Sequence, residues 1–171
     1  MMRCRLVAVM VVLLNLVGSI CFASIPRSEL ALGGVTLFTR FANVQHIYGQ
    51  PTSTSYKDYN IWGGTSRFYT QRYGNGSFIV TATNRDGVVS VTTTADNGIG
   101  TPAGIKVGMN QGRLAMVYGE VDSIWDDNNG DKIFVYNVKY EKKAAEPDCL
   151  QFTVRNGRII KISLVAGILS I

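Results

Sequence analysis

Short runs of alternating apolar and polar residues recur along the chain from residue 68 onward, and they predict strands with one buried face. Leu150, Phe152 and Val154 show the pattern clearly, with polar residues between them. Asp86-Gly87 and Asn156-Gly157 separate such runs, and both dipeptides favour two-residue hairpin turns, so we expect antiparallel pairing. The predicted strands are Phe68–Tyr73, Phe78–Thr83, Val88–Thr94, Lys132–Tyr140, Leu150–Val154 and Arg158–Val165, the last extended by the apolar tail Val165–Ile171.

Two other segments carry apolar residues at helical spacing. The first helix is expected to begin at Thr39 or Arg40, and Asn110 is a suitable N-cap for the second. Gly49 and Gly119 follow the last apolar positions, where a glycine commonly ends a helix. Both helices are too short to be stable alone, so they must pack against a sheet. Their apolar faces comprise Phe41, Val44, Ile47 and Tyr48 in the first helix and Leu114, Val117 and Tyr118 in the second.

The chain after residue 23 contains an internal repeat. Val35–Gly49 aligns with Ile105–Gly119 at a constant offset of 70 residues, apolar positions match, and both segments end in Tyr-Gly. The sequence therefore predicts an α+β fold of two tandem units, residues 24–98 and 99–171. Each unit consists of a short helix plus an antiparallel β-sheet, with the helices packed on one sheet face. The units could share one continuous sheet or form two layers.

The N-terminus has the features of a secretory signal peptide. Arg3 and Arg5 precede the apolar run Leu6–Leu16, and small residues at 21 and 23 favour cleavage after Ala23. The run is shorter than a membrane span, so no transmembrane segment is expected in the mature chain. Lipoprotein anchoring through Cys21 is disfavoured because Ile20, rather than a small residue, precedes it. We therefore expect a periplasmic or secreted protein.

Composition excludes several classes of protein. The 171 residues are 46% hydrophobic and 17% charged, which excludes an intrinsically disordered chain. Loss of Arg3 and Arg5 with the signal lowers the formal net charge from +5 to +3, too little to indicate nucleic-acid binding. One His and three Cys argue against a zinc or iron site, and only Cys149 remains in the mature chain. No cofactor is expected.

Candidate catalytic and metal-binding residues are few. His46 is the only candidate general base, and its repeat equivalent is Met116, so a repeated catalytic site is not indicated. The acidic stretch Asp122–Asp131 does not place Gly and Glu where a calcium loop needs them, which favours a solvated turn. We predict neither catalytic nor metal-binding residues. Serines and threonines in the strand runs, among them Thr81, Thr83, Thr92 and Thr93, are explained by β-propensity.

Aromatic residues give the clearest indication of a binding surface, because Tyr and Trp bury a large area at low entropic cost. Tyr56, Tyr59 and Trp62 occupy a polar connection. Four other tyrosines could line the sheet face away from the helices. The alternative is that these side chains fill the core of a small domain. The candidate surface comprises Tyr56, Tyr59, Trp62, Tyr69, Tyr73, Tyr136 and Tyr140.

The block Gly104–Asn110, followed by Leu114 and Val117-Tyr118-Gly119, resembles the signature of a known superfamily. It is similar to the Gly-Met-Ser/Thr-x-x-x-Val-x-x-x-x-Gly motif of the BamE/SmpA/OmlA-like and β-lactamase-inhibitor-protein-like proteins. The tandem copies resemble the inhibitor proteins, which double a helix-and-sheet unit, more than the single-unit assembly lipoproteins. The first copy has Phe38-Thr39 where the second has Gly108-Met109, and the inhibitors' paired cysteines are absent. The resemblance implies a binding role without naming a target.

The expected function is therefore a non-enzymatic, extracytoplasmic protein-binding module of the cell envelope. Its partner would be another protein or an envelope component. Alternatives are an inhibitor of a secreted hydrolase such as a β-lactamase or protease, structural material of the envelope, and, from another class, a small hydrolase using His46.

Overall fold

A computed structural model describes residues 24–61, 64–138 and 147–169. The predicted signal peptide, residues 1–23, lies outside the described residues. The same holds for Trp62 and Tyr140 of the predicted binding surface.

Eight antiparallel strands form one sheet in the order β3-β4-β5-β6-β10-β9-β8-β7. Its centre is the pairing of β6 with β10, where Thr93 lies opposite Ile162 and Val91 opposite Leu164. The last strand of the chain therefore lies in the middle of the sheet, while β3 and β7 form its edges. The strands are β3 (Ser53–Ile61), β4 (Gly64–Tyr73), β5 (Phe78–Thr83), β6 (Gly87–Thr93), β7 (Ser123–Asp126), β8 (Lys132–Asn137), β9 (Cys149–Arg155) and β10 (Arg158–Val165).

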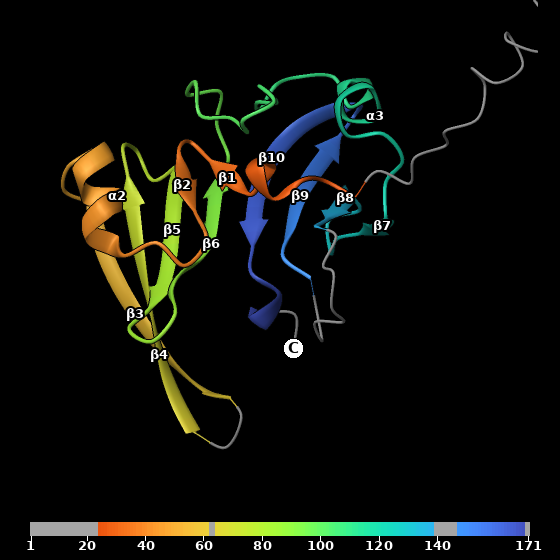
Figure 1. The fold of residues 1–171 in the computed structure, drawn as a ribbon. Coiled ribbons are helices and arrows are strands. Elements are labelled where there is room, and N and C mark those ends of the chain that lie inside the picture. Colours follow the sequence, from red (N-terminus) through yellow and green to blue (C-terminus); the bar gives the residue numbers. More distant parts are fainter. Residues whose placement is uncertain (1–23, 62–63, 139–146, 170–171) are drawn as a thin grey trace, which may run out of the picture.

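Small elements accompany this sheet. A two-stranded hairpin, β1 (Ala31–Leu32) and β2 (Val35–Thr36), lies between the two α-helices in the view of Figure 1. Leu32 and Val35 of this hairpin are fully buried in the core. The helical elements are α2 (Phe41–Tyr48), α3 (Gly112–Tyr118) and the 3-10 turns η1 (Arg27–Glu29) and η2 (Gly167–Leu169).

Each α-helix packs on the sheet through a tyrosine in its last turn. Tyr48 of α2 contacts Tyr73 and Phe78, with ring centroids 5.7 and 4.6 Å apart. Tyr118 of α3 contacts Phe152 and Tyr136, with centroids 5.7 and 5.3 Å apart. Phe78 and Phe152 lie in one row of paired residues that crosses the sheet through Thr93 and Ile162. Both helices therefore cover the same face.

The predicted fold class, two tandem helix-plus-sheet units, is wrong. The described chain is mostly antiparallel β-structure, 48% strand against 16% helix, in a single eight-stranded sheet. One hydrophobic cluster includes buried residues from both helices and from β4, β5, β6, β8, β9 and β10. If the two units were separate, the edges of β6 and β10 would be exposed, and pairing between these strands covers both edges. The sequence alternative of one continuous sheet is thus the correct one.

Local features follow the predictions more closely. Asn156 and Gly157 both adopt positive φ, as the two-residue hairpin turn requires. Gly49 and Gly119 end the helices with φ of 76° and 77°. The N-cap of α3 is Gln111 rather than the predicted Asn110. The Asn110 side-chain oxygen still accepts a hydrogen bond from the amide of Gly112, the first residue of the helix.

One prediction about strand extent is wrong, and two strands have no predicted counterpart. The tail after Val165 does not extend the last strand, because η2 turns away and the Gly167 amide donates to the carboxylate of the buried Asp148. The edge strands β3 and β7 were not predicted at all. Every β7 residue is exposed, so neither face imposes an apolar alternation on it.

Acid should remove a stabilising contact between the turn before β8 and the end of β9. The Arg155 guanidinium donates to both Asp131 oxygens at 2.8 and 2.6 Å, and this bonding lowers the pKa of Asp131 below its ordinary value of 3.8. A carboxyl whose pKa is lower in the folded state stabilises the fold above the unfolded pKa and loses that effect as the pH falls through the folded pKa. Urea unfolding from about pH 7 to about pH 2 should therefore show the wild type and Asp131→Asn converging in acid.

The exposed pair formed by Asp58 and Arg67 provides the control for this titration. Asp58→Asn should change stability less at every pH, because exposed ion pairs contribute little. A difference between wild type and Asp131→Asn that stays constant with pH would contradict the assignment.

Candidate binding face

The sheet face opposite α2 and α3 carries rows of hydroxyl side chains. Tyr73 and Phe78 face the helices. Arg72 comes directly before Tyr73 and Ile79 directly after Phe78, so the side chains of Arg72 and Ile79 point to the other face. We call this second face the hydroxyl face. Two rows of directly paired residues cross it: Ser55, Thr70, Thr81 and Ser90 in one, and Ser53, Arg72, Ile79, Thr92, Ser163 and Gln151 in the other.

Hydroxyls on neighbouring strands bond to one another across this face. Thr70 and Thr81 oxygens lie 3.2 Å apart, and those of Thr92 and Ser163 lie 3.0 Å apart. Because these side chains are small, another polypeptide could come close to the backbone of the sheet here. They also offer both hydrogen-bond donors and acceptors to a partner.

A groove of about 720 Å³ lies on the β3–β6 half of the hydroxyl face. The hydroxyl row from Ser55 to Ser90 lines it, and η2 lies along it because the chain turns back after β10. The walls therefore combine hydroxyl, aromatic, aliphatic and cationic side chains. Besides the hydroxyls, its lining includes Tyr56, Lys57, Tyr59, Phe68, Arg72, Ile168 and Leu169.

Aromatic and cationic side chains gather at the β3–β4 end of the groove. Tyr59 packs edge-to-face on Phe68 with centroids 5.2 Å apart, while the Lys57 ammonium lies 4.8 Å from the Tyr59 ring centroid. Tyr59 remains 44% exposed, whereas Phe68 is buried. The exposed tyrosine ring is thus held in place by two contacts within its own hairpin.

The end of the β3–β4 hairpin projects beyond β5, whose last residue Thr83 pairs with Phe68 (Figure 1). We call the projecting part, residues 58–61 and 64–67, the ribbon. Across its two strands the Arg67 guanidinium donates to both Asp58 oxygens at 2.7 and 2.9 Å, and these bonds lower the pKa of Asp58. Arg67 also lies over the Tyr56 ring, 4.4 Å from its centroid. These cross-strand contacts fix the register of a hairpin that little else supports.

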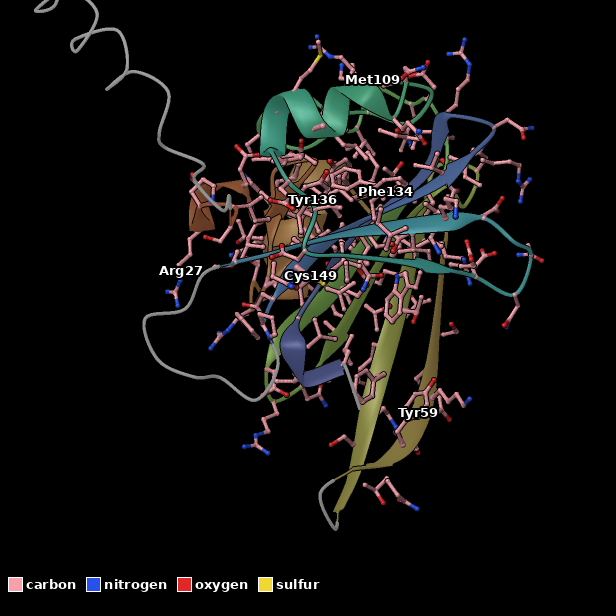
Figure 2. The ribbon with its side chains drawn as sticks, turned by 90° about the vertical axis from the view of Figure 1, so that its right-hand side faces the viewer. Arg27, Tyr59, Met109, Phe134, Tyr136 and Cys149 are labelled. Carbon is pink, nitrogen blue, oxygen red and sulfur yellow. The ribbon has the colours of Figure 1, made fainter. Side chains whose placement is uncertain are left out.

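The structure separates the predicted aromatic residues into different environments. Tyr59 lies on the hydroxyl face, while Tyr56 and Tyr69 pair with each other on the opposite face of the hairpin. Tyr73 and Tyr136 are 4% and 1% exposed beneath the helices, so their assignment to an exposed surface is wrong. Figure 2 shows Tyr59 on the ribbon and Tyr136 below α3.

Burial raises the pKa of both Tyr73 and Tyr136. Burial, assisted by the charge of Asp122, raises the pKa of Tyr136 to about 12. Both phenols therefore belong to the core.

The sequence patterns do not assign four of the groove residues to a binding surface: Lys57, Arg72, Ile168 and Leu169. The recurrence of Ser and Thr along the strands was the available signal. Thr81 and Thr92 face the groove side as members of the hydroxyl rows, whereas Thr93 is fully buried on the helix side. β-propensity alone does not distinguish these two positions.

The residues considered for catalysis or metal binding lie elsewhere. His46 is exposed on α2. Asp127 accepts hydrogen bonds from the amides of Asn129 and Asp131, so its carboxylate organises the turn before β8. Within residues 24–61, 64–138 and 147–169, no three His, Cys, Asp or Glu side chains are grouped to hold a metal ion. In the same ranges, no helix has the length and apolar character needed to cross a membrane.

Comparison of the chain with protein-family models, curated proteins and solved structures finds no match. The similarity to the BamE and β-lactamase-inhibitor-protein-like superfamily therefore remains a prediction from the short motif at residues 104–119.

Proposed function

We propose that the protein is an extracytoplasmic protein-binding module of the cell envelope and that its partner docks in the groove of the hydroxyl face. One observation carries the proposal: a groove of about 720 Å³ lies on a sheet face without α-helices and has the exposed Tyr59 ring at its end. Export is inferred from the signal sequence of residues 1–23.

The groove has the chemical make-up of a protein-binding site. Tyr59 supplies a large ring that Phe68 and Lys57 already hold in position, so little entropy is lost when a partner packs on it. Hydroxyls along the floor supply hydrogen bonds, and aliphatic side chains of η2 supply apolar contact area. Interfaces commonly concentrate their binding energy in such an aromatic residue surrounded by weaker contacts.

Tyr59→Ala is expected to weaken partner binding by about tenfold or more, the usual effect of removing an aromatic anchor. Tyr69→Ala is the matched control, because Tyr69 lies on the neighbouring strand but on the opposite face of the sheet. The tagged protein and both variants would be used to capture proteins from an envelope extract, followed by quantitative mass spectrometry. Affinities for the purified partner would then be measured by calorimetry.

Equal loss of capture in both variants, or no loss in Tyr59→Ala, would contradict docking in the groove. If the captured protein is a hydrolase, its activity in the presence of the wild type tests the inhibitor alternative. Thermal unfolding of each variant shows whether a loss of capture reflects a loss of folding.

A further inference from the structure

The groove is positively charged. Among the described residues that line it, the charged ones are Lys57 and Arg72, and neither Asp nor Glu is present. The nearest acidic residue on the same strand, Asp58, points to the opposite face and is occupied by Arg67. The groove therefore attracts anionic groups at the same surface where Tyr59 offers a ring.

The register places the two cations at a defined separation. Lys57 lies opposite Phe68, and Arg72 lies four residues further along β4 on the same face. At about 3.3 Å per residue, the two positions are about 13 Å apart along the strand. In an extended peptide, residues i and i+4 have the same separation and face the same side, with residue i+2 between them.

We propose that the groove binds an extended segment of a partner protein that carries two acidic residues four positions apart, with an apolar residue midway. This rests on the proposed function and names the chemistry of the partner. The carboxylates lie against Lys57 and Arg72. The middle side chain lies level with Thr70, in the row that ends at Ser90 beside the start of η2, and so faces Ile168 and Leu169. The hydroxyls of Thr70 and Thr81 face the backbone of the segment.

A protein segment fits these observations better than another polyanion. Two cations about 13 Å apart neutralise few charges, whereas nucleic-acid binding proteins engage many successive phosphates. The aliphatic and aromatic part of the lining has no role toward a phosphate backbone, but it matches an apolar side chain.

Selection of displayed random dodecapeptides on the purified protein tests the proposal. Peptides enriched on the wild type should contain two Asp or Glu residues at i and i+4 with an apolar residue at i+2. The double variant Lys57→Glu, Arg72→Glu should instead enrich peptides with Lys or Arg at those positions. The matched control is the double variant Arg113→Glu, Arg158→Glu, which has the same change in charge. Arg113 is exposed on α3 and Arg158 starts β10, both outside the groove lining. Peptides enriched on this control should retain the acidic motif.

Fluorescence anisotropy with the most enriched peptide then gives the size of the effect. The dissociation constant should rise by about tenfold or more in Lys57→Gln, Arg72→Gln and change less than about twofold in the control. Rising salt should weaken wild-type binding. Circular dichroism and thermal unfolding verify that each variant is folded.

The failures of the two proposals are distinguishable. Enrichment of neutral peptides whose binding is lost in Tyr59→Ala overturns the acidic motif but leaves the groove as the docking site. Acidic peptides that bind equally to the charge-reversed variant overturn the motif as well. Tighter wild-type binding to a single-stranded oligonucleotide or to anionic lipid vesicles than to the acidic peptide also overturns a protein segment as the occupant.

Discussion

Gly87→Ala is expected to lower the free energy of unfolding by about 3 kcal/mol, of which about 1 kcal/mol is backbone strain and the rest lost hydrogen bonding. Gly87 begins β6 with φ of 76°, a conformation that L side chains rarely adopt. A Cβ atom there would lie 2.7 Å from the carbonyl oxygen of Phe38 and 2.8 Å from that of Thr39. Both contacts are to backbone atoms, so rotation of a side chain cannot relieve them.

The affected backbone atoms connect β6 to the segment before α2. The Phe38 amide donates to the Val88 carbonyl at 2.7 Å, and the Val88 amide donates to the Thr39 carbonyl at 2.8 Å. Moving the Phe38–Thr39 segment away from a new methyl group breaks this pair of hydrogen bonds. Urea unfolding followed by far-UV circular dichroism gives the change in free energy.

Gly74→Ala separates strain from collision. Gly74 has φ of 59°, and nothing lies within 4 Å of a Cβ placed there. Its replacement should cost about 1 kcal/mol, from the left-handed backbone alone. Equal losses in the two variants would show that the Phe38–Thr39 segment yields freely and that the hydrogen-bonded pair contributes little.

Phe152→Ala is expected to have the largest effect, a loss of about 3–5 kcal/mol, as is usual for removing a buried aromatic side chain. Phe152 is fully buried in β9, and its ring contacts both Tyr118 of α3 and Tyr136 of β8. The variant loses the transfer free energy of the ring and leaves a cavity that rigid neighbouring strands cannot fill. It also removes one of the two rings on which Tyr118 of α3 packs.

Ile124→Ala is the control within the same row of the sheet. Ile124 is paired to Phe134, which is paired to Phe152, but it lies on the edge strand and is 49% exposed. Its truncation should change the free energy of unfolding by about 0.5 kcal/mol or less. Comparable losses in both variants would mean that the β7 edge carries core packing that its exposure does not indicate.

Sequence patterns identified elements that obey a local rule. The turn at Asn156-Gly157 and the helix ends at Gly49 and Gly119 were predictable because each depends on the conformation of one or two residues. The strands β3 and β7 were not predictable in this way, because an edge strand exposed on both faces shows no alternation. The pairing of β6 with β10 joins residues about 70 positions apart, and no local pattern records it.

Local patterns also fail to show which residues line the groove, because this depends on how the strands pair. Tyr59 and Tyr73 are similar as sequence, but one lies on the ribbon and the other beneath α2. Which face a strand residue occupies depends on the register with its neighbours, and a shift of one residue reverses it. The importance of Lys57 and Arg72 appears only once β3 and β4 are paired, because their separation follows from that register.

The central position of β10 sets the order in which the chain can fold during synthesis. β3 to β6 can pair as successive hairpins, but the open side of β6 has no partner until the final segment, Arg158–Val165, is available. Long-range pairing of this kind slows folding, because the loop must close before the contacts form. The two halves of the sheet therefore join only when β10 is available, and until then β6 presents an unpaired edge to other strands.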